Sequence, residues 1–172
     1  VYEDVRHGTA DLGLVAFPIK HKEVTIIPFA TDELIVAMNP SHPLAGKKNI
    51  SIEELKNLEF IAFEKDIPTR KATDEILRSA DVQISIVMEF DNVETVKRAL
   101  EINAGVAIIP KNTVSNEAER KQLVTSRLDN GQHIRPLSLI HKKSRMLTPA
   151  LRSFIEKMKL SPEDSKVNAL LG

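Results

Sequence analysis

The residues best suited to binding chemistry stand where a strand is expected to end and a helix to begin. In "EKDIPTR", residues 64–70, Thr69 and Arg70 place a hydroxyl beside a guanidinium, a pair that could bind a carboxylate or a phosphate by charge-assisted hydrogen bonds. The unpaired amides of a helix start would add a partial positive charge. An equally good interpretation is that Thr69 caps the helix and Arg70 is a solvated residue of its first turn. "DNVE" (91–94) and "PKNT" (110–113) are similar strand-to-helix points.

The sequence contains no motif that is typical of an enzyme active site or of a metal site. The motifs G-x-S-x-G, H-E-x-x-H and G-x-G-x-x-G are absent, and there is no cysteine. Glu53 and Glu54 are neighbours on a predicted helix and point in different directions, and helix capping explains Glu54. The histidines are isolated from one another along the chain: His7, His21, His42, His133 and His141. We therefore expect no catalytic residue, no metal site and no cofactor.

The composition is that of an ordinary globular domain whose balanced charges produce no strong electrostatic field. Among 172 residues, 42% are hydrophobic and 28% charged, and 24 basic side chains balance 24 acidic ones. A neutral chain lacks the long-range attraction that draws nucleic acid or an anionic membrane. Aromatic residues make up 4%, too few for a platform that stacks single-stranded bases. We expect this chain not to bind DNA or a membrane by itself.

The elements that position these residues can be read from hydrophobic periodicity. A helix ending at Gly8 precedes a strand over 11–17, and residues 24–39 predict two extended pieces separated by Pro28. A capping box at Ser51 and Glu54 predicts a short helix. Strands and helices then alternate, which is typical of a parallel sheet with right-handed crossovers. The predicted strands cover 58–63, 84–90, 106–110, 123–128 and 134–143, and the predicted helices cover 68–80, 112–120 and a segment that Asp91 caps and that ends at Gly105. A closing helix is predicted with Thr148 as its N-cap and four apolar residues at helical spacing: Leu151, Phe154, Ile155 and Met158.

Two details of these helices are specific enough to be tested. In the helix over 68–80, Asp74 and Arg78 are one turn apart and predict an outward ion pair. In the next helix, Asp91 is predicted to be the N-cap, with Glu94 in the capping-box position. A turn is predicted at Asn130 and a loose tail after residue 160.

Several stretches, in this order and spacing, resemble the effector-binding domain of LysR-type transcriptional regulators. They are "VRHGTADLGLV", "DELIVAMNPSHPLAGKKNISIEEL", "FIAFEKDIPTR", "NVETVKRALEINAGVAIIP" and "RPLSLIHKK", and the similarity covers about residues 1–160. The resemblance implies an α/β fold of two Rossmann-like lobes joined by two crossing strands, like type 2 periplasmic-binding proteins. Lobe I would be 1–38 plus 137–160, lobe II 39–136, and 161–172 a C-terminal tail, with "HPLA" and "PLSLI" marking the two crossings.

The same resemblance implies a function and a set of contact residues. The chain would be the regulatory domain of a cytoplasmic bacterial transcription factor that binds a small anionic metabolite in the cleft between the lobes. The partners implied are this effector, a second or further copies in a homo-dimer or homo-tetramer, and DNA through an N-terminal helix-turn-helix only. The ligand-binding residues implied are Pro68, Thr69, Arg70, Phe17, Pro18 and Pro110.

The chain also departs from the family pattern, and two other functions stay open. It begins at Val1, at the tail of what resembles the second helix of lobe I, so earlier strands and the helix-turn-helix are expected upstream and lobe I is expected to be incomplete. An unpaired strand edge is unstable in water, so lobe I is hypothesised either to need a neighbouring chain or to be partly disordered. The alternatives are an extracytoplasmic solute-binding protein of the same fold, and an enzyme on this scaffold, which the lack of an aligned base and nucleophile disfavours.

Overall fold

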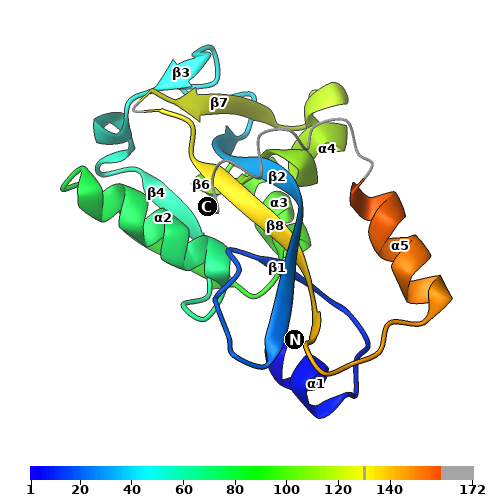
Figure 1. Ribbon diagram of the computed structural model, residues 1–172. Helices are drawn as coiled ribbons and strands as arrows, with labels where there is room; N and C mark the ends of the chain where they lie inside the picture. The colour runs from blue at the N-terminus through cyan, green and yellow to red at the C-terminus, as the bar shows by residue number, and fades with distance from the viewer. Residues whose placement is uncertain (130, 160–172) are drawn as a thin grey trace. The chain divides into compact units, whose positions relative to one another are not determined.

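By its internal contacts the chain divides into two units. Figure 1 shows the helices and strands in their order along the chain. The computed structural model describes residues 1–129 and 131–159; the predicted turn residue Asn130 and the predicted tail lie outside the described residues. Unit 1 comprises Val1–Asp32 and the chain from Arg135 onward, and unit 2 is Glu33–Ile134. The polypeptide therefore passes between the units inside strand β2 (Val24–Met38) and at the start of strand β8 (Ile134–Lys142).

Unit 1 is built on a short antiparallel ladder. Strand β1 (Gly13–Ala16) pairs with β8, with Gly13 opposite Ile140 and Ala16 opposite Leu137. Helix α1 (Tyr2–His7) ends at Gly8, whose φ of 79° lies in the left-handed region that glycine adopts without strain. Val5 of this helix forms a small core with Val24 and Ile140. The predicted helix end at Gly8 and the predicted first strand are confirmed.

Helix α5 (Pro149–Lys159) closes the described part of unit 1. The amide of Leu151 donates a hydrogen bond to Thr148 Oγ1 at 3.3 Å, so Thr148 acts as the predicted cap. Of the apolar residues predicted to share one face, Ile155 is buried, whereas Phe154 is exposed. Periodicity identified the helix correctly but overstated how much of its apolar stripe is covered.

Unit 2 is a mixed sheet in which the predicted parallel strands stand side by side. Strand β4 (Glu59–Phe63) is parallel to both β5 (Ser85–Phe90) and β6 (Val106–Pro110). Strand β2 is antiparallel to β6 on one side and to β7 (Val124–Leu128) on the other, and β3 (Asn49–Ile50) is parallel to β7. The alternation of strands and helices therefore predicted the parallel centre correctly, and β2 and β7 add antiparallel neighbours to it.

Helices cover both faces of this sheet. Helix α3 (Val93–Glu101), the 3-10 turn η2 (Lys111–Val114) and helix α4 (Ser115–Glu119) lie on the face that carries Ile61 and Ile109. Helix α2 (Pro68–Ser79) packs on β4 and β6, where the buried Phe60 and Ile108 point to the other face. All of β6 is buried, as its continuous apolar run predicts.

Strand β2 corrects one prediction from the sequence. Residues 24–38 form a single strand of 15 residues, where two extended pieces were predicted around Pro28. A proline holds an extended backbone and gives up only one ladder hydrogen bond, so it need not end a strand. The capping box is confirmed: the amide of Ser51 donates to the Glu54 carboxylate at 3.1 Å, and the helix it starts is the single turn η1 (Ile52–Leu55).

The start of helix α3 corrects a second prediction. Its N-cap is Asn92, whose side-chain oxygen accepts a hydrogen bond from the Thr95 amide at 3.0 Å, and not Asp91. Glu94 does not complete a capping box with Asp91; its carboxylate pairs with Lys97 at 2.8 Å. Both Asp and Asn are good N-caps, so the sequence could not decide between adjacent positions; the backbone turns helical only after Asn92, where φ is −138° and ψ is 155°.

Replacing Asn92 by alanine is expected to lower the free energy of unfolding by about 1 kcal/mol, because the Thr95 amide loses its only side-chain acceptor at the cap. Asp91→Ala is the matched control, since Asp91 precedes the cap. Urea unfolding followed by circular dichroism measures both variants. An equal or larger loss for Asp91→Ala would contradict the assignment of the cap.

Candidate ligand-binding site

The structure brings three of the predicted ligand residues to one edge of unit 2. Strands β4 and β6 are parallel neighbours, so their carboxyl ends share an edge of the sheet. Pro68 and Thr69 follow β4 as the first two residues of α2, and Pro110 is the last residue of β6. A ligand held at this edge could reach both loops, which is the usual place for ligands in open α/β sheets.

The two simple structural interpretations of Thr69 and Arg70 are wrong. The N-cap of α2 is Ile67, which has no oxygen in its side chain, and Thr69 is the second residue of the helix. The hydroxyl of Thr69 is therefore not the cap of this helix, although the residue is buried. Arg70 is 6% exposed, so it is not a solvated residue of the first turn.

Arg70 is engaged by three groups of unit 2. Its Nε donates to Asp74 at 2.8 Å, and one Nη donates to the carbonyl of Phe63 at 2.7 Å and also to the Glu89 carboxylate. The ion pair predicted for Asp74 is thus made with Arg70, one turn earlier, and not with Arg78. Burial opposes the charged form of Arg70, but the hydrogen bonds to Glu89 and Asp74 outweigh it and raise its pKa. Arg70 ties α2 to β4 and β5.

Lys97 of α3 is also buried, and its charge is likewise balanced by two carboxylates. Its Nζ lies 2.8 Å from carboxylate oxygens of both Glu94 and Glu117, and it donates to the carbonyl of Thr113 at 3.2 Å. Burial opposes its charge, yet the hydrogen bonds to Glu117 and Glu94 leave its pKa raised. Thr113 in turn donates from Oγ1 to the carbonyl of Pro110 at 2.6 Å. These bonds hold the loop after β6 in a defined shape.

The remaining predicted residues, Phe17 and Pro18, belong to unit 1. Phe17 follows β1 with a φ of 50°, a left-handed conformation that is uncommon for a large side chain. Its amide donates to the carbonyl of Pro136 at 2.9 Å, which extends the β1–β8 ladder by one residue. Backbone strain of this kind is often kept at ligand-binding positions, so the loop after β1 remains a candidate.

Sequence reasoning missed Arg135, which lies at the start of β8 beside that loop. Its Nη1 is 3.8 Å from Asp32 Oδ2, beyond hydrogen-bonding distance, and its Nε is buried without a hydrogen-bond partner among the described residues. Burial lowers the pKa of Arg135, and the charge of Asp32 offsets this only in part. An arginine next to Pro136, in the first half of a strand that is mostly apolar up to Ile140, was the signal that could have pointed to it.

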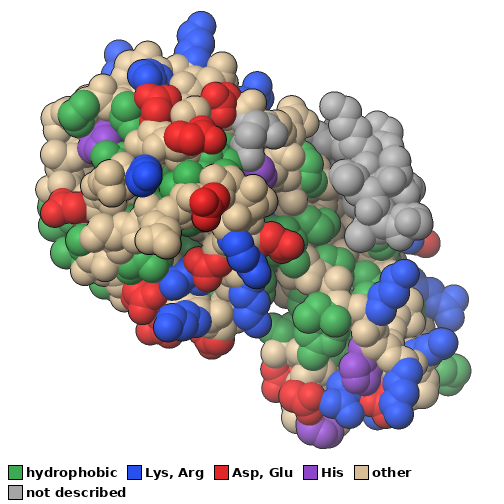
Figure 2. All heavy atoms as spheres, turned by 90° about the vertical axis from the view of Figure 1, so that its left-hand side faces the viewer, with side chains coloured by type: hydrophobic (Ala, Val, Ile, Leu, Met, Phe, Trp, Pro, Cys, Tyr) green, Lys and Arg blue, Asp and Glu red, His purple; other side chains and the backbone are tan. Residues whose placement is uncertain are grey.

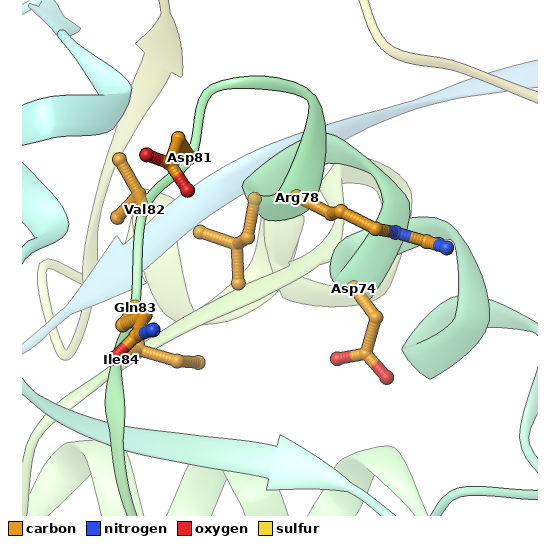
Figure 3. A pocket seen from close by; sticks show the side chains of 7 residues that line it. Asp74, Arg78, Asp81, Val82, Gln83 and Ile84 are labelled. Atoms are coloured by element: carbon orange, nitrogen blue, oxygen red, sulfur yellow. The ribbon is translucent and has the colours of Figure 1, made fainter.

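A hollow of about 420 Å³ lies elsewhere in unit 2, at the carboxyl end of α2. In Figure 3 Asp74 and Arg78 extend from the helix, and Asp81, Val82, Gln83 and Ile84 line the segment that leads into β5. Because Thr69 starts the helix and Arg78 is near its end, this hollow is separate from the strand-end edge described above. It is open and holds both signs of charge, and it brings together none of the predicted ligand residues.

The surface in Figure 2 carries acidic and basic side chains interspersed, consistent with equal numbers of the two kinds. Among residues 1–129 and 131–159, no three His, Cys, Asp or Glu side chains gather as metal ligands would. Within the same ranges no helix combines the length and the apolar character needed to span a bilayer.

Comparisons with known proteins give this geometry a context. Residues 1–160 match the family model of the LysR substrate binding domain. The chain is 29% identical over 161 residues to a probable RuBisCO transcriptional regulator of Cyanophora paradoxa, covering 90% of this chain and 50% of the relative. It is 30% identical over 159 residues to the HTH-type transcriptional regulator CysL of Bacillus subtilis, covering 92% and 53%. The chain thus spans about half the length of the curated relatives it matches.

A solved structure of a related regulatory domain has the same fold. The Synechocystis PCC6803 CcmR regulatory domain, determined in complex with 2-PG, superposes with a TM-score of 0.83 at 25% identity, over 92% of this chain and 76% of that one. This likeness confirms the predicted fold class, the type 2 periplasmic-binding-protein-like α/β fold of LysR regulatory domains.

Proposed function

The chain belongs to the LysR substrate-binding domain family, and from this we propose that it is the metabolite-sensing regulatory domain of a transcription regulator. The family match over residues 1–160 carries the proposal. The relatives are transcriptional regulators, which sets aside the extracytoplasmic solute-binding protein as an alternative. A regulator requires no turnover, so we propose that effector binding acts through conformation and not through catalysis. A cytoplasmic location follows from a role in transcription.

The proposed effector is a small anionic metabolite, and 2-PG is the first compound to test because it is bound by the CcmR regulatory domain. In unit 2, the proposed contacts are Pro68, Thr69 and Pro110, at the strand-end edge where β4 and β6 finish. In unit 1, they are Phe17 and Pro18. The lobes implied by the family, 1–38 with 137–160 and 39–136, correspond in this proposal to units 1 and 2.

The role of the remaining partners follows from the same proposal. DNA would be bound by a helix-turn-helix outside these residues, and a homo-dimer or homo-tetramer would carry the signal between copies. The effector must bind two conformations of the domain with unequal affinity to change that signal. Isothermal titration of the chain with 2-PG, followed by a panel of carboxylates and phosphate esters, tests the sensing function. A chain that binds no small metabolite would contradict it.

The clearest residue-level prediction concerns Thr69. Thr69→Val removes the hydroxyl but keeps the shape, and we expect it to weaken binding of the titrated effector about tenfold, the value of one hydrogen bond to an anion. Thr73→Val is the matched control: Thr73 is equally buried one turn later in α2, and its hydroxyl has no partner among the described residues. Equal affinities of the wild type and Thr69→Val in calorimetry would remove Thr69 from the site.

A further inference from the structure

The buried and partly buried cationic side chains considered for ligand binding differ in whether their hydrogen-bond donors are satisfied. Arg70 and Lys97 are each almost fully buried, and each is bonded to two carboxylates and a backbone carbonyl. A buried charge is tolerated in proteins when it is paired and its donors are satisfied. These two cations meet that condition within unit 2, and they need nothing further.

Arg135 does not meet the same condition. Its side chain is 21% exposed, and its guanidinium lies 3.8 Å from Asp32, too far for a hydrogen bond. Its Nε is buried and unpaired among the described residues. A desolvated guanidinium with an unused donor is costly in a folded chain, so an acceptor placed at Nε would stabilise it.

The chemistry of the missing acceptor follows from the guanidinium. Nε and the neighbouring Nη form a planar fork that matches two oxygens of a carboxylate or a phosphate. Asp32, near Nη1 on the adjacent strand, would orient the guanidinium as a positioning residue and leave the Nε side for the ligand.

The surroundings of Arg135 in unit 1 are suited to such a role. Its neighbour Pro136 accepts the amide hydrogen bond of Phe17, so Arg135 adjoins the strained loop after β1. β8 and β2 are neighbouring strands of the sheet, which brings Arg135 close to Asp32. A site on strands is held more precisely than one on loops alone.

We propose that Arg135 anchors the anionic group of the effector, with Asp32 as its positioning residue. The inference rests on the proposed sensing function. It adds to that function the residue that would make the site select an anionic ligand. It also moves the anion-binding role that the sequence offered as one of two interpretations of Arg70 to a different arginine, because Arg70 is already engaged by its own unit.

Inorganic phosphate is the probe, because it presents the required oxygens without any assumption about the rest of the effector. Thermal unfolding of the chain is followed in increasing phosphate, with sodium chloride added to keep ionic strength constant. We expect a saturable rise in Tm for the wild type, and an affinity about 10- to 100-fold lower for Arg135→Gln. Arg135→Lys keeps the charge but not the fork, so it should retain an intermediate affinity and covers the case that Arg135→Gln does not fold.

Arg127→Gln is the matched control. Arg127 is also a strand arginine facing a neighbouring carboxylate, that of Glu33 at 3.4 Å, but it is well exposed, so its loss should leave phosphate binding unchanged. The anchor is overturned if phosphate does not bind the wild type saturably, or if it binds both Arg135 variants as tightly as the wild type. Failure of the sensing function gives a different result: no metabolite binds, while phosphate still binds in a way that depends on Arg135.

Discussion

Replacing Gly105 by alanine is expected to lower the free energy of unfolding by about 2–4 kcal/mol, in the lower part of the range for backbone strain combined with overpacking. Gly105 precedes β6 with a φ of 150°, and a Cβ built there would lie 2.5 Å from the carbonyl oxygen of Glu59. That oxygen belongs to the first residue of β4, so relief of the clash requires the two central parallel strands to move apart. Urea unfolding of the variant and the wild type measures the loss.

Gly46 supplies the control for Gly105. A Cβ at Gly46 meets no atom within 4 Å, so Gly46→Ala should leave stability unchanged or raise it by about 0.5 kcal/mol through the unfolded chain. A loss of the same size in both variants would show that flexibility, and not the contact with Glu59, sets the requirement for glycine. Equal stability of Gly105→Ala and the wild type would contradict the register of β4 and β6.

Replacing Arg70 by methionine is the second change with a large expected effect. Methionine keeps the aliphatic packing but removes the donors to Asp74, Glu89 and the carbonyl of Phe63. We expect a loss of about 2–3 kcal/mol, at or just below the low end of the range for breaking a buried ion pair. The low end applies because the Asp74 and Glu89 side chains are 44% and 40% exposed and can be rehydrated, whereas the carbonyl of Phe63 is left without this donor.

Arg98→Met is the control for Arg70, since Arg98 makes an ion pair with Glu101 on the exposed surface of α3, and no measurable change is expected. Hydrogen exchange adds a local measurement: protection should fall in α2 and β5, which Arg70 joins, and persist in α3. Full stability of Arg70→Met would contradict its structural role and return it to the set of candidate ligand residues. Weak effector binding by this variant would not by itself identify a contact, because the start of α2 depends on Arg70.

The elements of this protein could be predicted from the sequence where the controlling interactions are local. The helix end at Gly8, the capping box at Ser51 and the buried run of β6 depend on neighbours within a few residues. The errors are of the same kind: the cap at Asn92 is one residue from the predicted one, and Pro28 lies within a strand. Capping residues and prolines indicate a boundary without locating it to one residue.

The candidate site could be predicted only as a set of chemical groups. The sequence showed that a hydroxyl and a guanidinium stand together at Thr69 and Arg70, and that Pro110 ends a buried strand. It did not show that Glu89, on the strand next to β4, accepts a hydrogen bond from the guanidinium of Arg70. Nor did it single out Arg135, whose near partner Asp32 is far away along the chain.

The sequence by itself determined the fold class, the order of strands and helices, and the family, because hydrophobic periodicity and short motifs act over a few residues. Tertiary structure alone decided which charges are satisfied. Hydrogen bonds and desolvation act over a few ångströms in space, so the state of each arginine depends on groups that sheet pairing brings beside it. Arg70 and Arg135 look alike in the sequence, and the strands around them give one a structural role and leave the other with an unused donor.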